Sequence, residues 1–140
     1  MPNTIPASHL DLLIRPIHGV LTTMMPDGQP QSSLVWCDYD GERARINTTL
    51  ERQKGKNMRA DPRATLLVVD PDDTTRFIEI RGEVELIEDG ALEHLDALTR
   101  AYTRHPQYYG YVFPAEQHKR ETRIICRLRP RRITLDAIHR

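Results

Sequence analysis

The stretch RFIEIRGEVELI, residues 76–87, decides the fold class. Four apolar residues fall on one face of the extended chain, namely Ile78, Ile80, Val84 and Leu86. Charged residues alternate with them on the other face, which is the period of a half-buried strand. Gly82 interrupts the apolar face, as a β-bulge or a barrel corner does. The pattern predicts a long antiparallel strand that bends near its middle.

More strands are predicted on both sides of this segment, because β-branched and apolar runs end at turn residues. These runs cover residues 18–25, 31–39, 44–49, 64–70 and 123–135. The turn PDGQP joins the first two into a hairpin, and Pro130 predicts a break in the last. Six or seven strands with few helices predict a mainly β chain, a closed or half-closed antiparallel barrel with helices at its mouths.

Helical spacing is seen in three places. Residues 6–14 predict a short helix capped by Ser8, with Leu10, Leu13 and Ile14 on the face that covers one end of the core. Residues 90–102 predict a second helix through the spacing of its leucines. A third, basic helix follows Thr48 and ends before Pro62.

The composition indicates one globular domain over residues 1–140, since 39% of the residues are hydrophobic. Twenty basic and twenty acidic residues cancel, which argues against general attraction to nucleic acid or to an anionic membrane. No segment approaches the roughly 18 apolar residues of a membrane span, and the N-terminus lacks a signal-peptide pattern. Cys37 and Cys126 stand alone, so we expect free thiols in the reducing cytoplasm and no metal site.

The basic helix lies in ERQKGKNMRADPRATLLV, residues 51–68. Thr48 and Glu51 have the spacing of a capping box, with Thr48 as the N-cap. On the helical wheel Lys54 points to the side of Asn57 and Met58, whereas Lys56 and its neighbours on the opposite face are expected to be solvated. Lys54 must therefore extend to solvent, pair with a carboxylate, or meet a bound anion. A phosphate is one such anion, because helix N-termini bind phosphate.

The order of these segments resembles that of the pyridoxamine 5′-phosphate oxidase-like split-barrel superfamily. The most specific part is Arg52-x-Lys54-x-x-Asn57 followed by Asp61-Pro62-Arg63. Within the superfamily, the chain is most similar to small oxidoreductases that depend on the deazaflavin coenzyme F420. The resemblance covers residues 18–135 and implies a homodimeric split barrel, with a cofactor site at the subunit interface built from both chains.

The resemblance also implies which residues bind the cofactor. Eleven positions match: Ser32, Ser33, Leu34, Val35, Trp36, Asn47, Thr48, Arg52, Lys54, Asn57 and Phe77. Residues 32–36 match the strand beside the flavin-type ring, and Asn47 and Thr48 complete the phosphate pocket. Lys54 matches the phosphate-binding lysine, Arg52 matches the arginine that accompanies it, and Phe77 is the side chain that the neighbouring chain supplies.

Two departures from the family pattern weigh against a true pyridoxamine 5′-phosphate oxidase. The C-terminal RRITLDAIHR, residues 131–140, lacks the Trp and Arg/His set that those oxidases use on pyridoxal phosphate, and two phosphate-binding arginines are missing. Ser32 and Gln53 stand where the flavin mononucleotide (FMN) oxidases have arginines, so a mononucleotide phosphate loses two partners. The resemblance therefore implies hydride transfer between F420 and a small molecule. An FMN enzyme of the same fold, or a protein that carries a flavin, deazaflavin or haem-like ligand without turnover, remains the alternative.

No residue is identified as catalytic from the sequence, because neither a proton donor nor a catalytic motif is recognisable. His18, alone at a strand start, is expected to be structural. The aromatic segment of residues 102–113 either packs its rings as a loop or dimer seam, or forms a wall of the substrate pocket. The arginines of residues 127–132 alternate along a strand and are expected on a solvated outer face.

Overall fold

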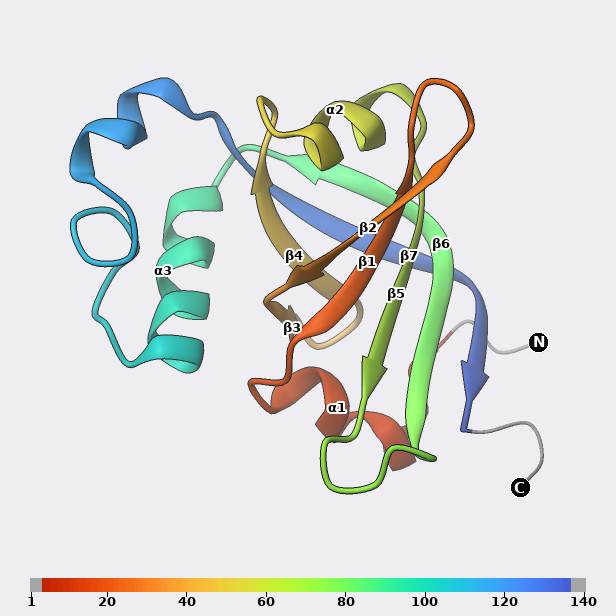
Figure 1. Ribbon diagram of the computed structural model, residues 1–140. Helices are drawn as coiled ribbons and strands as arrows, with labels where there is room; N and C mark the ends of the chain where they lie inside the picture. Colours follow the sequence, from red (N-terminus) through yellow and green to blue (C-terminus); the bar gives the residue numbers. More distant parts are fainter. Residues whose placement is uncertain (1–3, 137–140) are drawn as a thin grey trace.

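The computed structural model describes residues 4–136, in which seven strands form one sheet with helices at its ends and side (Figure 1). The strands are β1 (Gly19–Met24), β2 (Pro30–Val35), β3 (Cys37–Tyr39), β4 (Ala44–Thr49), β5 (Arg63–Val69), β6 (Phe77–Ile87) and β7 (Arg123–Leu135). The helices are η1 (Ala7–His9), α1 (Asp11–Ile14), α2 (Gln53–Ala60), α3 (Ala91–Thr103) and η2 (Ala115–Arg120), of which η1 and η2 are 3-10 helices. The predicted mainly β class is confirmed.

The sheet curls into a half-barrel with the strand order β2-β1-β5-β6-β7-β4-β3, and every pairing is antiparallel. The strand expected over residues 31–39 is therefore wrong as one element. The chain leaves β2 at one edge of the sheet, passes through Trp36, and enters β3 at the opposite edge. The apolar run of residues 34–37 continues through this crossing without a turn residue, so nothing in the pattern signals it.

The bend predicted at Gly82 is confirmed. The register between β6 and β7 shifts between Arg81 and Gly82, which is a β-bulge. A Cβ atom on Gly82 would lie 1.9 Å from the carbonyl oxygen of Arg129, so only glycine fits this close approach. The break expected at Pro130 is wrong, because β7 continues through the proline, which pairs with Gly82 at the bulge. The bulge accommodates the proline that we expected to interrupt the strand.

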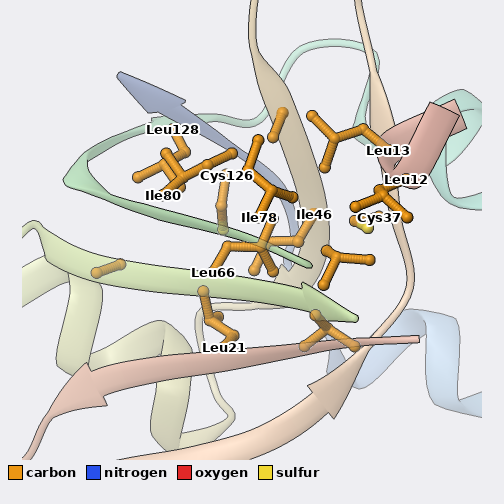
Figure 2. Close-up of a cluster of buried hydrophobic side chains, with 14 of the residues drawn as sticks. Leu12, Leu13, Leu21, Cys37, Ile46, Leu66, Ile78, Ile80, Cys126 and Leu128 are labelled. Atoms are coloured by element: carbon orange, nitrogen blue, oxygen red, sulfur yellow. The ribbon is translucent and has the colours of Figure 1, made fainter. Parts of the chain in front are cut away.

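The hydrophobic core fills the inside of the half-barrel (Figure 2), where side chains from all seven strands meet. Leu66, Ile78 and Ile80 are almost completely buried, and Leu12 and Leu13 of α1 close one end of the core. The predicted covering role of this segment is confirmed, but its predicted form is wrong. It divides into η1 and α1, Ser8 makes no cap, and Ile14 is exposed, because the chain turns out of the helix at the next residue.

The other end of the barrel is covered by α2, and its predicted capping box is wrong. Thr48 belongs to β4, where it pairs with Ile124 of β7. The Thr49 hydroxyl accepts a hydrogen bond of 3.0 Å from the backbone N–H of Arg52, and Glu51 accepts one from the backbone of residue 122. Pairing with β7 extends β4 to Thr49, so the helix begins only at Gln53.

Both cysteines are buried free thiols, as predicted. Burial raises the pKa of Cys37 to about 11 and that of Cys126 to about 12, so both are protonated at neutral pH. The arginines of residues 127–132 lie on the outer side of β7, as expected, and Arg127, Arg129 and Arg131 pair with carboxylates there. Within residues 4–136, no helix is long and apolar enough to cross a membrane.

Candidate functional site

A cavity of about 340 Å³ lies where α3 packs beside β4 and β7, near the start of α2. Six of the predicted site residues line it: Leu34, Val35, Trp36, Asn47, Arg52 and Lys54. Six residues that the sequence did not assign to the site also line it: His18, Leu95, Leu98, Tyr108, Val112 and Arg123. The volume lies at the lower end of the range of ligand pockets in proteins.

The lining divides into an apolar region and a cationic region. Side chains of β2 and α3 supply the apolar region, in which the Trp36 ring stacks on Tyr102 with ring centroids 5.4 Å apart. Arg52, Lys54 and Arg123 supply the cationic region. A ligand with a flat apolar ring at one end and an anionic group at the other would match both regions.

The two arginines of the cationic region share one carboxylate. Terminal nitrogens of Arg52 and Arg123 each lie 3.4 Å from a carboxylate oxygen of Glu121. The buried Arg123 guanidinium also lies over the Tyr108 ring, 4.7 Å from its centroid, and donates a 3.0 Å hydrogen bond to the Tyr109 hydroxyl. Arg123 is therefore fixed by stacking and hydrogen bonding, whereas Arg52 is only half-buried.

Lys54 differs from these arginines because no carboxylate and no hydrogen-bond acceptor among the described residues pairs with its ammonium group. The side chain is half-buried, and burial together with the charges of Arg52 and Arg123 lowers the pKa of Lys54. Of the three alternatives for Lys54, a carboxylate partner is therefore excluded within the part of the chain that the structure describes. Lys56 on the same helix is exposed, as expected.

Asn47 connects the cavity to a buried histidine. Its amide nitrogen donates hydrogen bonds to the carbonyl oxygen of Ala91 at 2.8 Å and to Nδ1 of His94 at 3.1 Å. Because Nδ1 accepts, Nε2 of His94 carries the proton and donates a hydrogen bond to Asp38 at 3.2 Å. The Asn47 carbonyl oxygen is then directed to Arg123, which donates to it at 3.3 Å.

Asp38, at the far end of this chain of contacts, is ionised. Burial alone would raise the pKa of Asp38, but hydrogen bonds from His94 and Arg45 hold it below its usual range. The carboxylate accepts the hydrogen bond from His94, and in this way the protein determines how Asn47 presents its amide to the cavity.

The aromatic segment of residues 102–113 combines the two roles that its sequence left open. Tyr108 and Tyr109 pack with Leu95 as a small second core, and Tyr108 also lines the cavity. Their hydroxyls bond to protein groups, since Tyr108 accepts from Arg52 and Tyr109 donates to Glu121 at 2.6 Å. The hydroxyls thus position the cations, while the Tyr108 ring forms the wall.

Five predicted site residues do not line the cavity in this chain. Asn57 is 2% exposed and donates hydrogen bonds to Thr23 and Gln31, which fasten α2 to the barrel. Thr48 is similarly buried, and its hydroxyl has no partner among the described residues. Both side chains are therefore buried in this chain, away from the lining of the cavity.

The remaining three positions lie along the sheet. Ser32 is exposed on β2 and bonds to the Thr22 hydroxyl at 2.8 Å, and Ser33 is its neighbour on the same strand. Phe77 begins β6, where it pairs with Val69. Its expected place in the site of a neighbouring chain stays a prediction.

A larger cavity of about 510 Å³ lies along β1, β5 and β6, but its charges are already paired. Arg63 pairs with Asp61, Arg81 with Glu79, and Arg131 with Glu83. The smaller cavity is therefore the better candidate for an anionic ligand, because it has a lining cation, Lys54, that lacks a partner within residues 4–136.

The family model for pyridoxamine 5′-phosphate oxidase matches residues 5–135, almost the whole chain. The chain belongs to this family. A solved structure named F420 reductase is 34% identical, with a TM-score of 0.78, over 93% of this chain and 98% of the other. This match confirms the predicted resemblance to the deazaflavin branch of the pyridoxamine 5′-phosphate oxidase-like superfamily.

Two further solved structures share the fold of the family. A conserved hypothetical protein from Mycobacterium tuberculosis is 25% identical, with a TM-score of 0.67, over 97% of this chain and 88% of the other. A haem-binding protein from Mycobacterium smegmatis is 20% identical, with a TM-score of 0.60, over 94% of this chain and 54% of the other. At such identity the second match shows the fold alone.

Sequence reasoning missed Arg123 as a site residue of this family member. The sequence gives little to distinguish Arg123 from the other arginines of the last strand, which lie on its outer side. Its pairing with Thr49, at the end of β4, is what places it beside the start of α2. His18 was expected to be structural, and it contacts the edge of Tyr102 but also lines the cavity.

Proposed function

We propose that this chain is an F420-dependent oxidoreductase that acts on a small-molecule substrate in the cytoplasm, as a homodimer without nucleic-acid or membrane partners. The observation that carries the proposal is the ammonium of Lys54, unpartnered within residues 4–136, beside Arg52 and Arg123 in a cavity that apolar side chains also line. A relative named F420 reductase at 34% identity supports the choice of cofactor.

The donor set suits this coenzyme, which carries a phosphodiester and a tail of glutamate carboxylates. Lys54 and Arg52 would hold the phosphodiester, and Asn47 would hold Arg123 in place beside them through its carbonyl oxygen. Trp36 and the backbone of β2 would lie beside the ring, because β2 is a sheet edge whose outer backbone groups have no ladder partner among the described strands. When bound, the deazaflavin supplies two-electron hydride transfer to or from a substrate double bond or carbonyl.

The protein's own contribution would be placement and exclusion of water. Leu95, Leu98 and Val112 make one side of the cavity apolar, which favours a stacked ring over water. The tyrosine hydroxyls near the cations are engaged with protein groups. We therefore assign no proton donor, and solvent would supply the proton of the reduced substrate.

The outer face of the sheet supports the homodimer. Leu34, Val20 and Leu67 are neighbours across β2, β1 and β5, and Leu34 is 68% exposed. An apolar row that leads to the mouth of the cavity fits a self-association surface. Light scattering of the wild-type protein should give twice the chain mass of 16.2 kDa. Leu67→Lys, in the apolar row, should be monomeric, and the control Ala97→Lys, on the exposed side of α3, should stay dimeric. A monomeric wild type would refute the dimer.

The cofactor is tested by titrating the protein with F420 and with FMN while Trp36 fluorescence is recorded. Trp36 is the only tryptophan and lines the cavity, so a stacked ring should quench it. Tight quenching by F420 and weak quenching by FMN, followed by oxidation of reduced F420 with an acceptor, is the expected result. No quenching of Trp36 fluorescence by either ligand would refute the proposed cofactor site.

An FMN-dependent enzyme of the same fold is the second candidate, and Arg123 favours it. The FMN oxidases have arginines where this chain has Ser32 and Gln53, and the buried Arg123 partly replaces them. The cavity therefore still offers three cations to a phosphate monoester. Tighter quenching by FMN than by F420 would select this candidate. Binding of either ligand without turnover by any acceptor would indicate a carrier.

A further inference from the structure

Glu121 is an acidic residue in direct contact with the cationic end of the cavity, although it does not line the cavity itself. Its side chain is 12% exposed, and one oxygen accepts a 2.6 Å hydrogen bond from the Tyr109 hydroxyl. The two oxygens also contact Arg123 and Arg52, each at 3.4 Å. The carboxylate is therefore held in one place by three groups from three different segments of the chain.

This arrangement fixes the charge that the cavity offers to a ligand. Arg52, Lys54 and Arg123 contribute three positive charges, and Glu121 removes one of them. The contacts to the arginines are long for charge-assisted hydrogen bonds, which leaves the guanidinium groups able to bind a further anion. An anion bound by Arg52 would be separated from the Glu121 carboxylate by the Arg52 guanidinium alone. The carboxylate would therefore repel each additional negative charge on that anion.

We propose that Glu121 is the residue that makes this site prefer a singly charged phosphodiester over a doubly charged phosphate monoester. This inference rests on the proposed function and adds the charge class of the ligand and the residue that sets it. Glu121 acts through the arginines and touches no ligand, so it is a positioning residue.

The expected size of the effect follows from the distance. At about 7 Å and an effective dielectric constant of about 35, one additional ligand charge changes the affinity about tenfold. Removing the Glu121 charge should change the affinity for a dianion by that factor more than it changes the affinity for a monoanion. A merely structural role of Glu121 would change both affinities by the same factor.

The experiment compares two ligands that share one ring. FMN carries a phosphate monoester, which is a dianion at pH 8, and riboflavin 4′,5′-cyclic phosphate carries a diester with one charge. Dissociation constants for both are measured by Trp36 quenching with wild-type protein, with Glu121→Gln and with the control Glu116→Gln. The Glu121→Gln side chain keeps an oxygen that can accept from Tyr109, and Glu116 is exposed on η2.

We expect Glu121→Gln to raise the preference for FMN over the cyclic diester about tenfold, with no change in Glu116→Gln. An unchanged ratio, with both ligands still bound, would overturn the role of Glu121 and leave the cofactor site intact. Failure of the wild type to bind either ligand or F420 would instead overturn the proposed function and this inference together.

Discussion

Replacing Lys54 with methionine should raise the stability of the free protein while it weakens ligand binding. The Lys54 ammonium is half-buried, has no counter-charge among the described residues, and lies near two arginines. Methionine keeps the length of the side chain and removes the charge, which should stabilise the folded state by about 0.5–1 kcal/mol. For a chain of 140 residues this raises the melting temperature by about 1–4 °C.

The loss in binding should be larger than the gain in stability. A charge-assisted hydrogen bond from lysine to a phosphate is worth about 2 kcal/mol, so the ligand affinity should fall by a factor of about 30. The opposite signs of the two effects distinguish a binding residue from a structural one. A lysine that only extends over the apolar surface to reach solvent would lose packing and stability on replacement and leave ligand binding unchanged.

Thermal unfolding of the free protein and Trp36 titration with F420 or FMN measure the two effects. Lys56→Met is the matched control, because Lys56 is exposed on the same helix and should change neither quantity appreciably. A Lys54→Met variant that melts at a lower temperature and binds its ligand like wild type would refute the assignment of Lys54 to an anion site.

The same lysine gives a pH dependence. Its pKa is below 10.5 in the folded protein, so between the lowered value and 10.5 the unfolded chain binds more protons than the folded chain. The free energy of unfolding that depends on Lys54 therefore rises with pH across this window. Ligand affinity falls over the same window because the ammonium loses its charge, and Lys54→Met should remove both trends.

Three other substitutions are predicted to act through contacts that only the fold creates. Gly55→Ala should destabilise the protein by about 2–3 kcal/mol in urea unfolding, although alanine favours helix, because its Cβ would lie 1.9 Å from the Thr49 carbonyl oxygen; a neutral effect would contradict this packing. His94→Leu removes the acceptor that orients the Asn47 amide and should weaken ligand binding several-fold, whereas His94→Gln can still accept this hydrogen bond and should retain most of the affinity. Equal losses of affinity in both variants would show that the orientation of the Asn47 amide is irrelevant to binding. Burial would raise the pKa of Asp40, yet hydrogen bonds from an arginine and two backbone N–H groups lower it to about 2. The free energy of unfolding should therefore decrease as pH falls from 3.8 through 2, and Asp40→Asn should remove this decrease in an acid titration.

Local patterns were sufficient to predict most of the strands. Residues 76–87 alternate with a period of two, so their strand, its buried face and the bulge at Gly82 could be identified from the order of the residues alone. The position of β4 at residues 44–49 was also predicted correctly. The capping box at Thr48 failed because helix propensity and capping are weak compared with a ladder of hydrogen bonds to β7.

Part of the site was also predictable. The spacing of Arg52 and Lys54 identified one basic cluster, and the resemblance to a known family gave it a role. The same reasoning assigned Asn57 to the site, yet its amide faces the barrel interior. A motif shows that a residue is needed in a fold, but it does not show whether the residue contacts the ligand or supports the helix that does.

The sequence by itself determined the mainly β class, the family and the presence of a basic helix before Pro62, because these depend on the order and spacing of neighbouring residues. Only the tertiary structure decided that Arg123 and Tyr108 line the same cavity as Lys54, and that Glu121 contacts its arginines. These residues lie more than fifty positions from Lys54 along the chain, and the pairing of β4 with β7 and the packing of α3 against both bring them together. The charge of the site is a property of that assembly, since each cation's environment is set by residues that are distant in sequence.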